Sequence, residues 1–269
     1  MPELPEIANR AREMQEHLTG RIIAGVEVIQ PKCLNEPPDA FRTHISGAVI
    51  RSTTHRGKWI LTEFDRGWLL LNLGMGGELL LVNRANLPVK YRLVFDFADG
   101  DCLSVNFWWF GYSHFCSPEG IKNHPQVSKL GKNALEVTAE DLAAISGHRK
   151  TAIKTLLLDQ TCIAGIGNAY IHDILFLARF HPLRPASSLS AKERNDLIDA
   201  IHRGLEPSLA KGGAFYELNL LGQKGGFLFE DILVGYREGQ PCPECSAPIM
   251  KIKTGSTSSF ICPKCQILV

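Results

Sequence analysis

Residues 242–245 read Cys-Pro-Glu-Cys, and residues 262–265, sixteen residues later, read Cys-Pro-Lys-Cys. Two Cys-x2-Cys pairs at this separation form a four-thiolate zinc site, because each pair places two sulfur atoms on one side of a small ion. Four thiolates leave no open coordination position, so one structural Zn2+ is expected. The expected ligands are Cys242, Cys245, Cys262 and Cys265. The alternating pattern of residues 250–261 predicts a β-hairpin that the metal holds together.

The composition sets wide bounds on the remainder of the chain. With 269 residues, 45% of them hydrophobic, the chain can form two cores, or one large core and the zinc module. No apolar run approaches the length of a membrane span, and the N-terminal MPELPEI carries acids where a signal peptide needs cations. We therefore expect a soluble, cytoplasmic protein without a membrane partner, and a monomer. The formal net charge of +1 does not by itself indicate a nucleic-acid binder.

The pattern of apolar and polar residues changes twice along the chain. Residues 2–18 carry a loose apolar face and two early prolines, which predicts a helix. Residues 22–116 are short β-branched and aromatic runs separated by turn residues, which predicts a β-sandwich or a flattened barrel. A polar connector at residues 118–133 ends this region, and helical periodicity follows it.

The helical region contains a glycine-rich turn that is a candidate anion site. Thr138-Ala-Glu-Asp141 is a capping box that begins one helix, and Ser190-Ala-Lys-Glu193 begins another. Gly165-Ile-Gly-Asn-Ala-Tyr170 lies between two further helical stretches, where glycine lets backbone N–H groups approach a phosphate. An ordinary tight turn between helices has the same pattern, so this motif alone leaves both interpretations open.

The N-terminus is the second feature that suggests chemistry. Once Met1 is removed, Pro2 has a free secondary amine, followed by Glu3 and Glu6. A terminal amine is less basic than lysine, so more of it is neutral and nucleophilic near pH 7. Attack on a sugar carbon gives an iminium, and neighbouring carboxylates can transfer the protons. The competing interpretation is an ordinary helix start, with acids balancing the helix dipole. If Met1 is retained, the nitrogen of Pro2 is an amide and cannot attack.

Taken together, these and further motifs resemble those of the formamidopyrimidine-DNA glycosylase / endonuclease VIII family. They occur in the family's order, at near-family spacing, across the whole chain. The matching motifs are Pro2-Glu3-Leu4-Pro5-Glu6, His55-Arg-Gly57-Lys58, Leu73-Gly74-Met75, Asp159-Gln160 leading into Gly165-Ile-Gly167-Asn168, and the closing four-cysteine hairpin.

The resemblance implies an α+β multidomain fold. An N-terminal helix plus β-sandwich would occupy residues 1–130, a helix–two-turn–helix domain residues 131–238, and a zinc β-hairpin residues 239–269. It also implies base-excision repair of double-stranded damaged DNA. The enzyme would release an oxidised base and then cleave the abasic site by β,δ-elimination.

The resemblance assigns catalytic roles at the N-terminus. Pro2 would attack C1′ of the deoxyribose, Glu3 would be the general acid/base that helps open the sugar, and Glu6 would support the site. Lys58 belongs both to this catalytic set and to the DNA-binding set.

The resemblance also assigns DNA contacts. Lys58 and Asn168 would bind phosphates beside the lesion, and Lys154 would lie near the catalytic pocket. The target nucleotide must swing out of the helix, and Met75 and Phe110 would fill the space it leaves.

Two departures from the family pattern affect damage recognition. Asn106-Phe107-Trp108-Trp109-Phe110-Gly111 replaces the usual Asp-Pro-Arg-Arg-Phe-Gly, so the arginine that would read the opposite base is lost. Trp108 can stack on any base, which makes selectivity for cytosine doubtful; alternatively, Trp108 and Trp109 simply pack a strand. Thr257 replaces the arginine that grips phosphates around the flipped nucleotide, and Lys251 or Lys253 would be partial substitutes. Residues 213–227, over the extruded base, also differ from the 8-oxoguanine-specific pattern.

These departures leave alternatives to a complete glycosylase. One is a lyase acting mainly on abasic sites or single strands, because aromatic stacking suits unpaired bases. Another is a damaged-DNA binding module that no longer releases bases. A zinc-ribbon interaction protein without DNA would require the N-terminal motif to be a coincidence.

Overall fold

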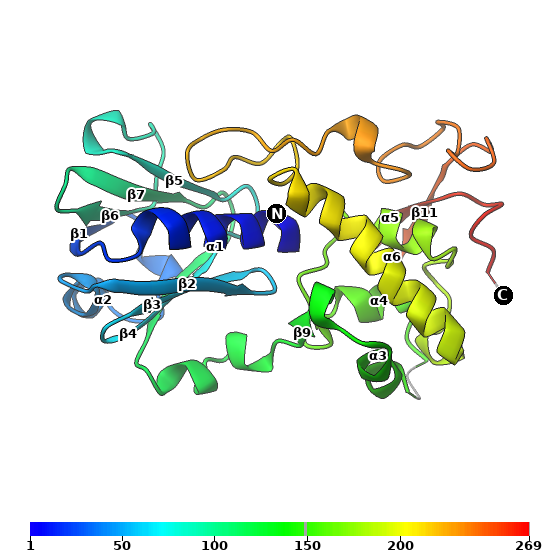
Figure 1. Ribbon diagram of the computed structural model, residues 1–269, viewed down its shortest axis with the longest axis horizontal. Helices are drawn as coiled ribbons and strands as arrows, with labels where there is room; N and C mark the ends of the chain where they lie inside the picture. The colour runs from blue at the N-terminus through cyan, green and yellow to red at the C-terminus, as the bar shows by residue number, and fades with distance from the viewer. Residues whose placement is uncertain (148–149, 269) are drawn as a thin grey trace. The chain divides into compact units, whose positions relative to one another are not determined.

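The computed structural model describes residues 1–147 and 150–268, which pack as two compact units (Figure 1). Unit 1 consists of Met1–Lys129 together with Lys211–Gly226. Unit 2 consists of Leu130–Ala210 together with the chain from Phe227 onward. The expected domain boundaries at residues 130 and 238 stay a prediction.

Unit 1 is a β-sandwich with one long helix, which confirms the expected sandwich. Its two antiparallel four-stranded sheets have the strand orders β1-β6-β7-β5 and β2-β3-β4-β8. The helices are α1 (Leu4–Leu18) and α2 (Pro38–Ile45). The strands are β1 (Ile23–Val28), β2 (Ile50–Arg56), β3 (Trp59–Phe64), β4 (Gly67–Asn72), β5 (Glu78–Asn83), β6 (Leu93–Phe97), β7 (Asp101–Asn106) and β8 (Tyr112–Cys116).

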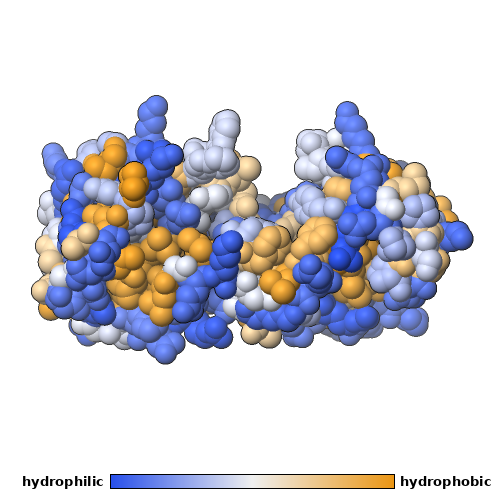
Figure 2. All heavy atoms as spheres, turned by 90° about the horizontal axis from the view of Figure 1, so that it is seen from above, coloured by the Kyte–Doolittle hydropathy of each residue, from blue (hydrophilic) through white to orange (hydrophobic). Residues whose placement is uncertain are grey.

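Helix α1 is anchored in the sandwich core by its apolar face. Ile7, Met14 and Leu18 are fully buried at helical spacing and join the core that the strands form. The face drawn in Figure 2 carries hydrophobic patches between hydrophilic ones. The anchored helix fixes the position of the residues that precede it.

The short helix α2 was not expected in a region that reads as strands. It begins at Pro38, directly after Pro37, because proline suits the first turn of a helix, and it buries Phe41 and Ile45 one turn apart. Eight residues with a single apolar pair give too little periodicity to detect in the sequence.

Two buried histidines connect strand β8 to the segment that follows it. Nδ1 of His114 lies 2.8 Å from Nε2 of His124, and Nδ1 of His124 accepts the backbone N–H of Val127 at 3.0 Å. The ring of His124 therefore carries its proton on Nε2 and donates it to His114. Protonating Nδ1 of His114 would set two N–H groups against each other. Burial, and secondarily His124, lowers the pKa of His114 from 6.5 to about 4.

Because of the pair His114 and His124, we expect unit 1 to lose stability in mild acid. The unfolded state binds a proton at His114 near pH 6.5 and the folded state near pH 4, so the contribution is complete above pH 6.5 and is lost as pH falls toward 4. We expect a loss of about 2 kcal/mol between pH 7 and pH 5 from this group. Urea unfolding followed by tryptophan fluorescence measures it, because all four tryptophans lie in unit 1.

The matched variants are His114→Gln and His202→Gln. Glutamine at 114 keeps an acceptor for His124 but does not titrate, so the pH dependence should flatten. His202 lies on a helix of unit 2 with an exposed side-chain partner, and its replacement should change nothing. An equally steep pH dependence in His114→Gln would contradict the assignment.

Unit 2 is a helical assembly with a terminal β-hairpin. The Thr138 hydroxyl accepts the Asp141 N–H at 3.2 Å and the Asp141 carboxylate accepts the Thr138 N–H at 2.9 Å, so the expected capping box is confirmed. The helices are α3 (Ala139–Ser146), α4 (Ile153–Leu158), α5 (Ile171–Leu177) and α6 (Ala191–Ala210). The strands are the short parallel pair β9 (Lys132–Asn133) and β10 (Ile163–Ala164), and the antiparallel pair β11 (Met250–Thr254) and β12 (Thr257–Ile261). Across residues 1–147 and 150–268, no helix has the length and apolar character needed to cross a membrane.

Candidate active site and nucleic-acid interface

The residues before helix α1 form a buried carboxylate cluster. The helix begins at Leu4, two residues later than expected, because the backbone of Glu3 is extended and serves as the N-cap. Glu3 and Glu6 are only 3% and 2% exposed. One carboxylate oxygen of Glu6 accepts the backbone N–H of Glu3 at 2.9 Å. Glu6 thereby fixes the backbone beside Pro2, which is itself buried.

Lys58 adds a cation to this cluster. It lies in the turn between β2 and β3, and its carbonyl accepts the side-chain amide of Asn72 at 3.1 Å. Burial lowers the pKa of Lys58, while attraction to Glu3 and Glu6 acts in the opposite direction. The structure therefore brings Glu3, Glu6 and Lys58, which are distant in the sequence, into one electrostatic environment.

The segment 211–226 closes over the same cluster. The second carboxylate oxygen of Glu6 accepts the N–H of Ala214 at 3.1 Å, and the Glu13 carboxylate accepts the N–H of Leu220 at 2.8 Å. A Cβ on Gly213, whose φ is +102°, would lie 3.2 Å from Cγ of Glu6, so glycine permits this close approach.

Glu217, between these two anchors, is a site residue that sequence reasoning missed. Burial raises its pKa to about 7; the chain's amino group lowers it, and the nearby Glu6 raises it further. A third carboxyl group thus faces the cluster of Glu3 and Glu6. The unusual segment 213–227 was a signal that this region differs, but nothing in it singled out Glu217.

Two loops of unit 1 present exposed apolar side chains together. Met75 lies between β4 and β5, and Trp108 and Phe110 lie between β7 and β8. The three are 44%, 71% and 46% exposed, respectively. A Cβ on Gly74 would lie 1.3 Å from the carbonyl oxygen of Phe110, so the two loops touch through glycine.

The exposure of the tryptophans decides one open alternative. Trp108 is 71% and Trp109 is 74% exposed, and both lie outside the strands. The interpretation that they simply pack a strand is therefore wrong. Their faces are available to a partner, and Trp108 borders two hollows of about 400 Å3 that also contain Lys90 and Asn106.

In unit 2, Gln160 organises the turn that carries Asn168. Its side-chain nitrogen donates to the carbonyls of Leu158 and Ile166 at 3.0 and 2.9 Å, and its side-chain oxygen accepts the N–H of Gly165 at 2.9 Å. The N–H of Gly165 is therefore already hydrogen-bonded to Gln160. This weakens the hypothesis that the backbone N–H groups of the glycine-rich turn bind a phosphate. The side-chain amide of Asn168 instead extends toward the hydroxyl of Tyr236 at 3.3 Å.

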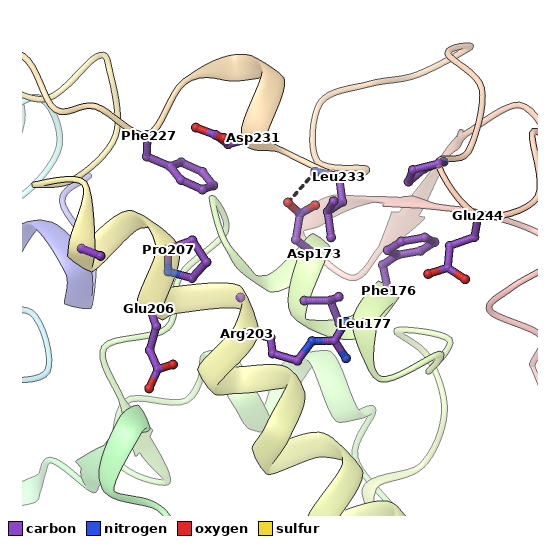
Figure 3. A pocket seen from close by; sticks show the side chains of 13 residues that line it. Asp173, Phe176, Leu177, Arg203, Glu206, Pro207, Phe227, Asp231, Leu233 and Glu244 are labelled. Carbon is purple, nitrogen blue, oxygen red and sulfur yellow. Dashed lines mark hydrogen bonds between the residues drawn. The ribbon is translucent and has the colours of Figure 1, made fainter.

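Tyr236 is held next to Asn168 by a buried acid that sequence reasoning also missed. The Asp173 carboxylate accepts the N–H groups of Leu233, Val234 and Gly235 at 2.8 to 2.9 Å; Figure 3 shows the first of these bonds. Burial raises the pKa of Asp173, and the three amides oppose the shift. Tyr236 follows with φ of 60°, a conformation that a bulky residue adopts only where its surroundings enforce it.

Beside Asp173 lies a hollow of about 710 Å3 (Figure 3). It is bordered by α5, α6 and the segment after Phe227, and it contains none of the residues expected to act in catalysis. All four acids around it already have partners: Asp173 accepts the N–H of Leu233, Asp231 accepts the N–H of Leu228, Glu244 pairs with Arg179, and Glu206 pairs with His202. We assign the hollow no part in the site.

Lys154 is buried in unit 2, where its ammonium binds the terminal hairpin. It is 3% exposed on α4, and its ammonium donates to the hydroxyls of Thr254 and Thr257 and to the carbonyl of Ser258, at 3.2, 3.0 and 2.6 Å. Burial lowers its pKa to about 8. Lys154 therefore contacts the tip of the terminal hairpin within unit 2, and its expected place near the catalytic pocket stays a prediction.

The four cysteines of unit 2 fit a single metal ion. Their sulfur atoms all lie within 4.8 Å of one another, with 3.9 Å between Cys242 and Cys265 and 3.4 Å between Cys245 and Cys262. A tetrahedral site with Zn–S bonds of about 2.3 Å needs sulfur separations of about 3.8 Å. The donor set is thus consistent with one structural zinc, as expected. Cys242 and Cys262 also belong to a small core with Phe176, Val234 and Phe260, among others.

The expected site residues therefore fall into two groups, each assembled within one unit. Unit 1 holds Pro2, Glu3, Glu6, Lys58, Met75, Trp108 and Phe110, and unit 2 holds Lys154, Asn168, Thr257 and the four cysteines. The roles of these residues stay predictions.

Family models match nearly the whole chain. The formamidopyrimidine-DNA glycosylase N-terminal domain matches residues 1–106, the formamidopyrimidine-DNA glycosylase H2TH domain residues 130–218, and the zinc finger found in FPG and IleRS residues 239–267. The formamidopyrimidine-DNA glycosylase of Roseiflexus sp. (strain RS-1) is 37% identical, covering 99% of this chain and 100% of that protein. That of Chloroflexus aurantiacus is 35% identical, covering 99% and 98%.

Solved structures agree with these matches. The Lactococcus lactis FPG mutant G226P in complex with Fapy-dG containing DNA has a TM-score of 0.91 at 26% identity, covering 99% of this chain and 100% of that chain. The Lactococcus lactis Fpg with abasic-site DNA also has a TM-score of 0.91, at 27% identity, covering 98% and 99%. Fold and domain matches together define a bifunctional DNA glycosylase and abasic-site lyase with a zinc finger. The chain belongs to the formamidopyrimidine-DNA glycosylase family.

Proposed function

We propose that this protein releases oxidised bases from double-stranded DNA through its N-terminal proline and then cleaves the abasic site by β,δ-elimination. The observation that carries the proposal is the cluster at the start of α1. Pro2, Glu3 and Glu6 are all buried there, and the two carboxylates attract the ammonium of Lys58. We further propose that it acts as a cytoplasmic monomer on chromosomal DNA.

The mechanism uses the amine that removal of Met1 exposes. The lone pair of Pro2 forms a bond to C1′ as the glycosidic bond breaks, and the base leaves with a proton. Glu3 delivers a proton to the ring oxygen as the C1′–O4′ bond breaks, which yields the iminium. Loss of the C2′ proton converts the iminium into an enamine, and the enamine electron pair then forms the C2′=C3′ bond as the bond from C3′ to the 3′ phosphate breaks. Loss of the C4′ proton then drives the second elimination, in which the bond from C5′ to the 5′ phosphate breaks.

Unit 2 and the two exposed loops supply DNA binding in this proposal. Asn168 and Lys58 contact phosphates beside the lesion, which position the strand without reading its sequence. Met75 and Phe110 enter the stack that the extruded nucleotide leaves. Both are exposed, and their loops are held together through Gly74.

Borohydride trapping tests the proposal, because only an amine that forms the iminium becomes covalently linked to DNA. The substrates are duplexes containing 8-oxoguanine, a formamidopyrimidine, 5-hydroxycytosine, thymine glycol or an abasic site. Pro2→Gly is the control that removes the secondary amine, and mass spectrometry establishes that Met1 is absent. Adducts with base lesions that require Pro2 support the proposal. An adduct with the abasic site alone reduces the activity to a lyase, and binding without any adduct leaves a damage-binding module.

Trp108 predicts weak discrimination of the base opposite the lesion. An indole stacks on any base and lacks the two donors that an arginine fork offers to a base edge. We expect single-turnover base release to differ by less than about threefold among the four opposite bases, since one bidentate contact contributes about 1–3 kcal/mol of discrimination. Trp108→Arg should create a preference of about tenfold or more, with Trp109→Arg as the matched control. A strong preference in the unmodified protein would contradict this role.

A further inference from the structure

Among the described residues, no carboxylate forms an ion pair with the buried ammonium of Lys154. Within residues 1–147 and 150–268, its hydrogen bonds go to two hydroxyls and one carbonyl, all of them neutral. The hairpin that it contacts, residues 250–261, contains two lysines and no acid. The nearby imidazole of His172 is held neutral, because burial and secondarily Lys154 lower its pKa to about 3.

A buried charge without a counter-charge is unfavourable and persists only where another group compensates it. An apolar side chain at this position of α4 would cost less free energy to bury, since Ile153, Leu156 and Leu157 around it are buried. The cation is instead aimed at the hairpin tip, next to solvent. The missing negative charge therefore comes from outside the described chain.

Thr257 links the buried ammonium of Lys154 to the surface, where an external anion can bind. Thr257 is exposed, and its hydroxyl oxygen accepts a hydrogen bond from the ammonium of Lys154 at 3.0 Å. The hydroxyl hydrogen then has one internal acceptor, the carbonyl of Thr254 at 3.4 Å, which is a weak bond. Rotation toward solvent lets Thr257 donate to an anion, with the ammonium polarising the O–H bond from behind.

The lysines of the hairpin do not replace this arrangement. The ammonium of Lys251 lies 5.9 Å from the ring centre of Phe260, in a cation–π contact. Lys253 is exposed, and Lys154 is the cation that contacts Thr257, the position where the family's arginine is expected.

We propose that Lys154 and Thr257 together form a phosphodiester-binding site at the tip of the zinc hairpin, in which the exposed hydroxyl contacts the DNA phosphate and the buried ammonium supplies the charge. The site replaces the single arginine side chain with a two-residue relay. This inference rests on the proposed function, because it takes the anion to be a phosphate of damaged DNA.

The test is equilibrium binding of the full-length, zinc-loaded protein to a duplex with a tetrahydrofuran abasic analogue, measured at several potassium chloride concentrations. Lys154→Met should weaken binding by about tenfold and reduce the salt slope by about one. Thr257→Val should weaken binding by a smaller factor. Lys154→Met/Thr257→Arg should recover both the affinity and the slope, since it returns a cation to the same place. Lys192→Met, on the exposed surface of α6, is the control for loss of a lysine.

Each outcome decides the proposal. If Lys154→Met keeps the affinity and the slope, or if the double variant binds no better than Lys154→Met, the relay does not exist. If Lys154→Met loses zinc or unfolds, Thr257→Val gives the decision, because it leaves the lysine in place, and binding equal to the unmodified protein overturns the site. Failure of the unmodified protein to form a borohydride adduct would instead overturn the proposed chemistry and leave the binding result intact.

Discussion

Replacing Glu3 with glutamine should slow base release by about 10²–10⁴-fold, the usual contribution of a positioned general acid/base. Glutamine has the same shape but cannot deliver a proton to the ring oxygen. The local backbone should change little, because the N–H of Glu3 is held by the carboxylate of Glu6 at 2.9 Å and a glutamine oxygen can still accept the backbone N–H of Glu6 in the capping box. Single-turnover release of a formamidopyrimidine base measures the effect.

Two comparisons isolate the proton transfer from folding and binding. Glu16→Gln removes one carboxylate from the exposed side of the same helix and should leave base release unchanged. Trapping of Glu3→Gln on a preformed abasic site should decrease much less than base release, since Pro2 still supplies the amine. Base release within about threefold of the unmodified protein would show that Glu3 is not the acid/base.

Replacing Cys262 with alanine should abolish zinc binding and reduce affinity for duplex DNA by more than about 100-fold. Three thiolates remain, and a hairpin of this size is held by the metal rather than by apolar burial. Cys262 is fully buried and also contributes to the small core around Val234 and Phe260, so its loss removes packing as well as a ligand. Metal content and binding to a tetrahydrofuran duplex measure the two effects.

The placement of the tryptophans makes this experiment specific to unit 2. All four lie in unit 1, so their fluorescence reports whether the sandwich survives the loss of zinc. Cys162→Ser changes a buried cysteine of the same unit outside the four-cysteine cluster, and it should retain zinc. Full DNA affinity in a zinc-free Cys262→Ala protein would contradict a structural role for the metal.

The features that could be predicted from the sequence are those governed by local rules. Paired cysteines at fixed spacing identified the hairpin, and Thr138 with Asp141 identified the start of α3. Each of these signals is contained within a few residues or a standard motif. The sandwich followed from repeated short alternating runs, although α2 was hidden among them because it is only eight residues long.

The remaining features depend on contacts between distant positions. Glu217 faces the N-terminal cluster only because Glu6 bonds to Ala214, a pair separated by 208 positions. Lys154 meets Thr257 across 103 positions, and no local pattern in the sequence predicts that contact. Asp173 likewise acts on residues about sixty positions away, and no local pattern marks such an acid as structural.

The passage of residues 211–226 back to unit 1 has a consequence for biosynthesis. Helix α1 leaves the ribosome well before residues 211–226, yet two of its carboxylates, Glu6 and Glu13, bond to Ala214 and Leu220. In the newly made sandwich, these two carboxylates therefore lack their backbone N–H partners until some two hundred further residues have been translated. A fragment that ends at residue 130 would contain the strands of the sandwich but not the hydrogen bonds from residues 214 and 220. Recombination can exchange this unit between relatives only if both segments are inherited together.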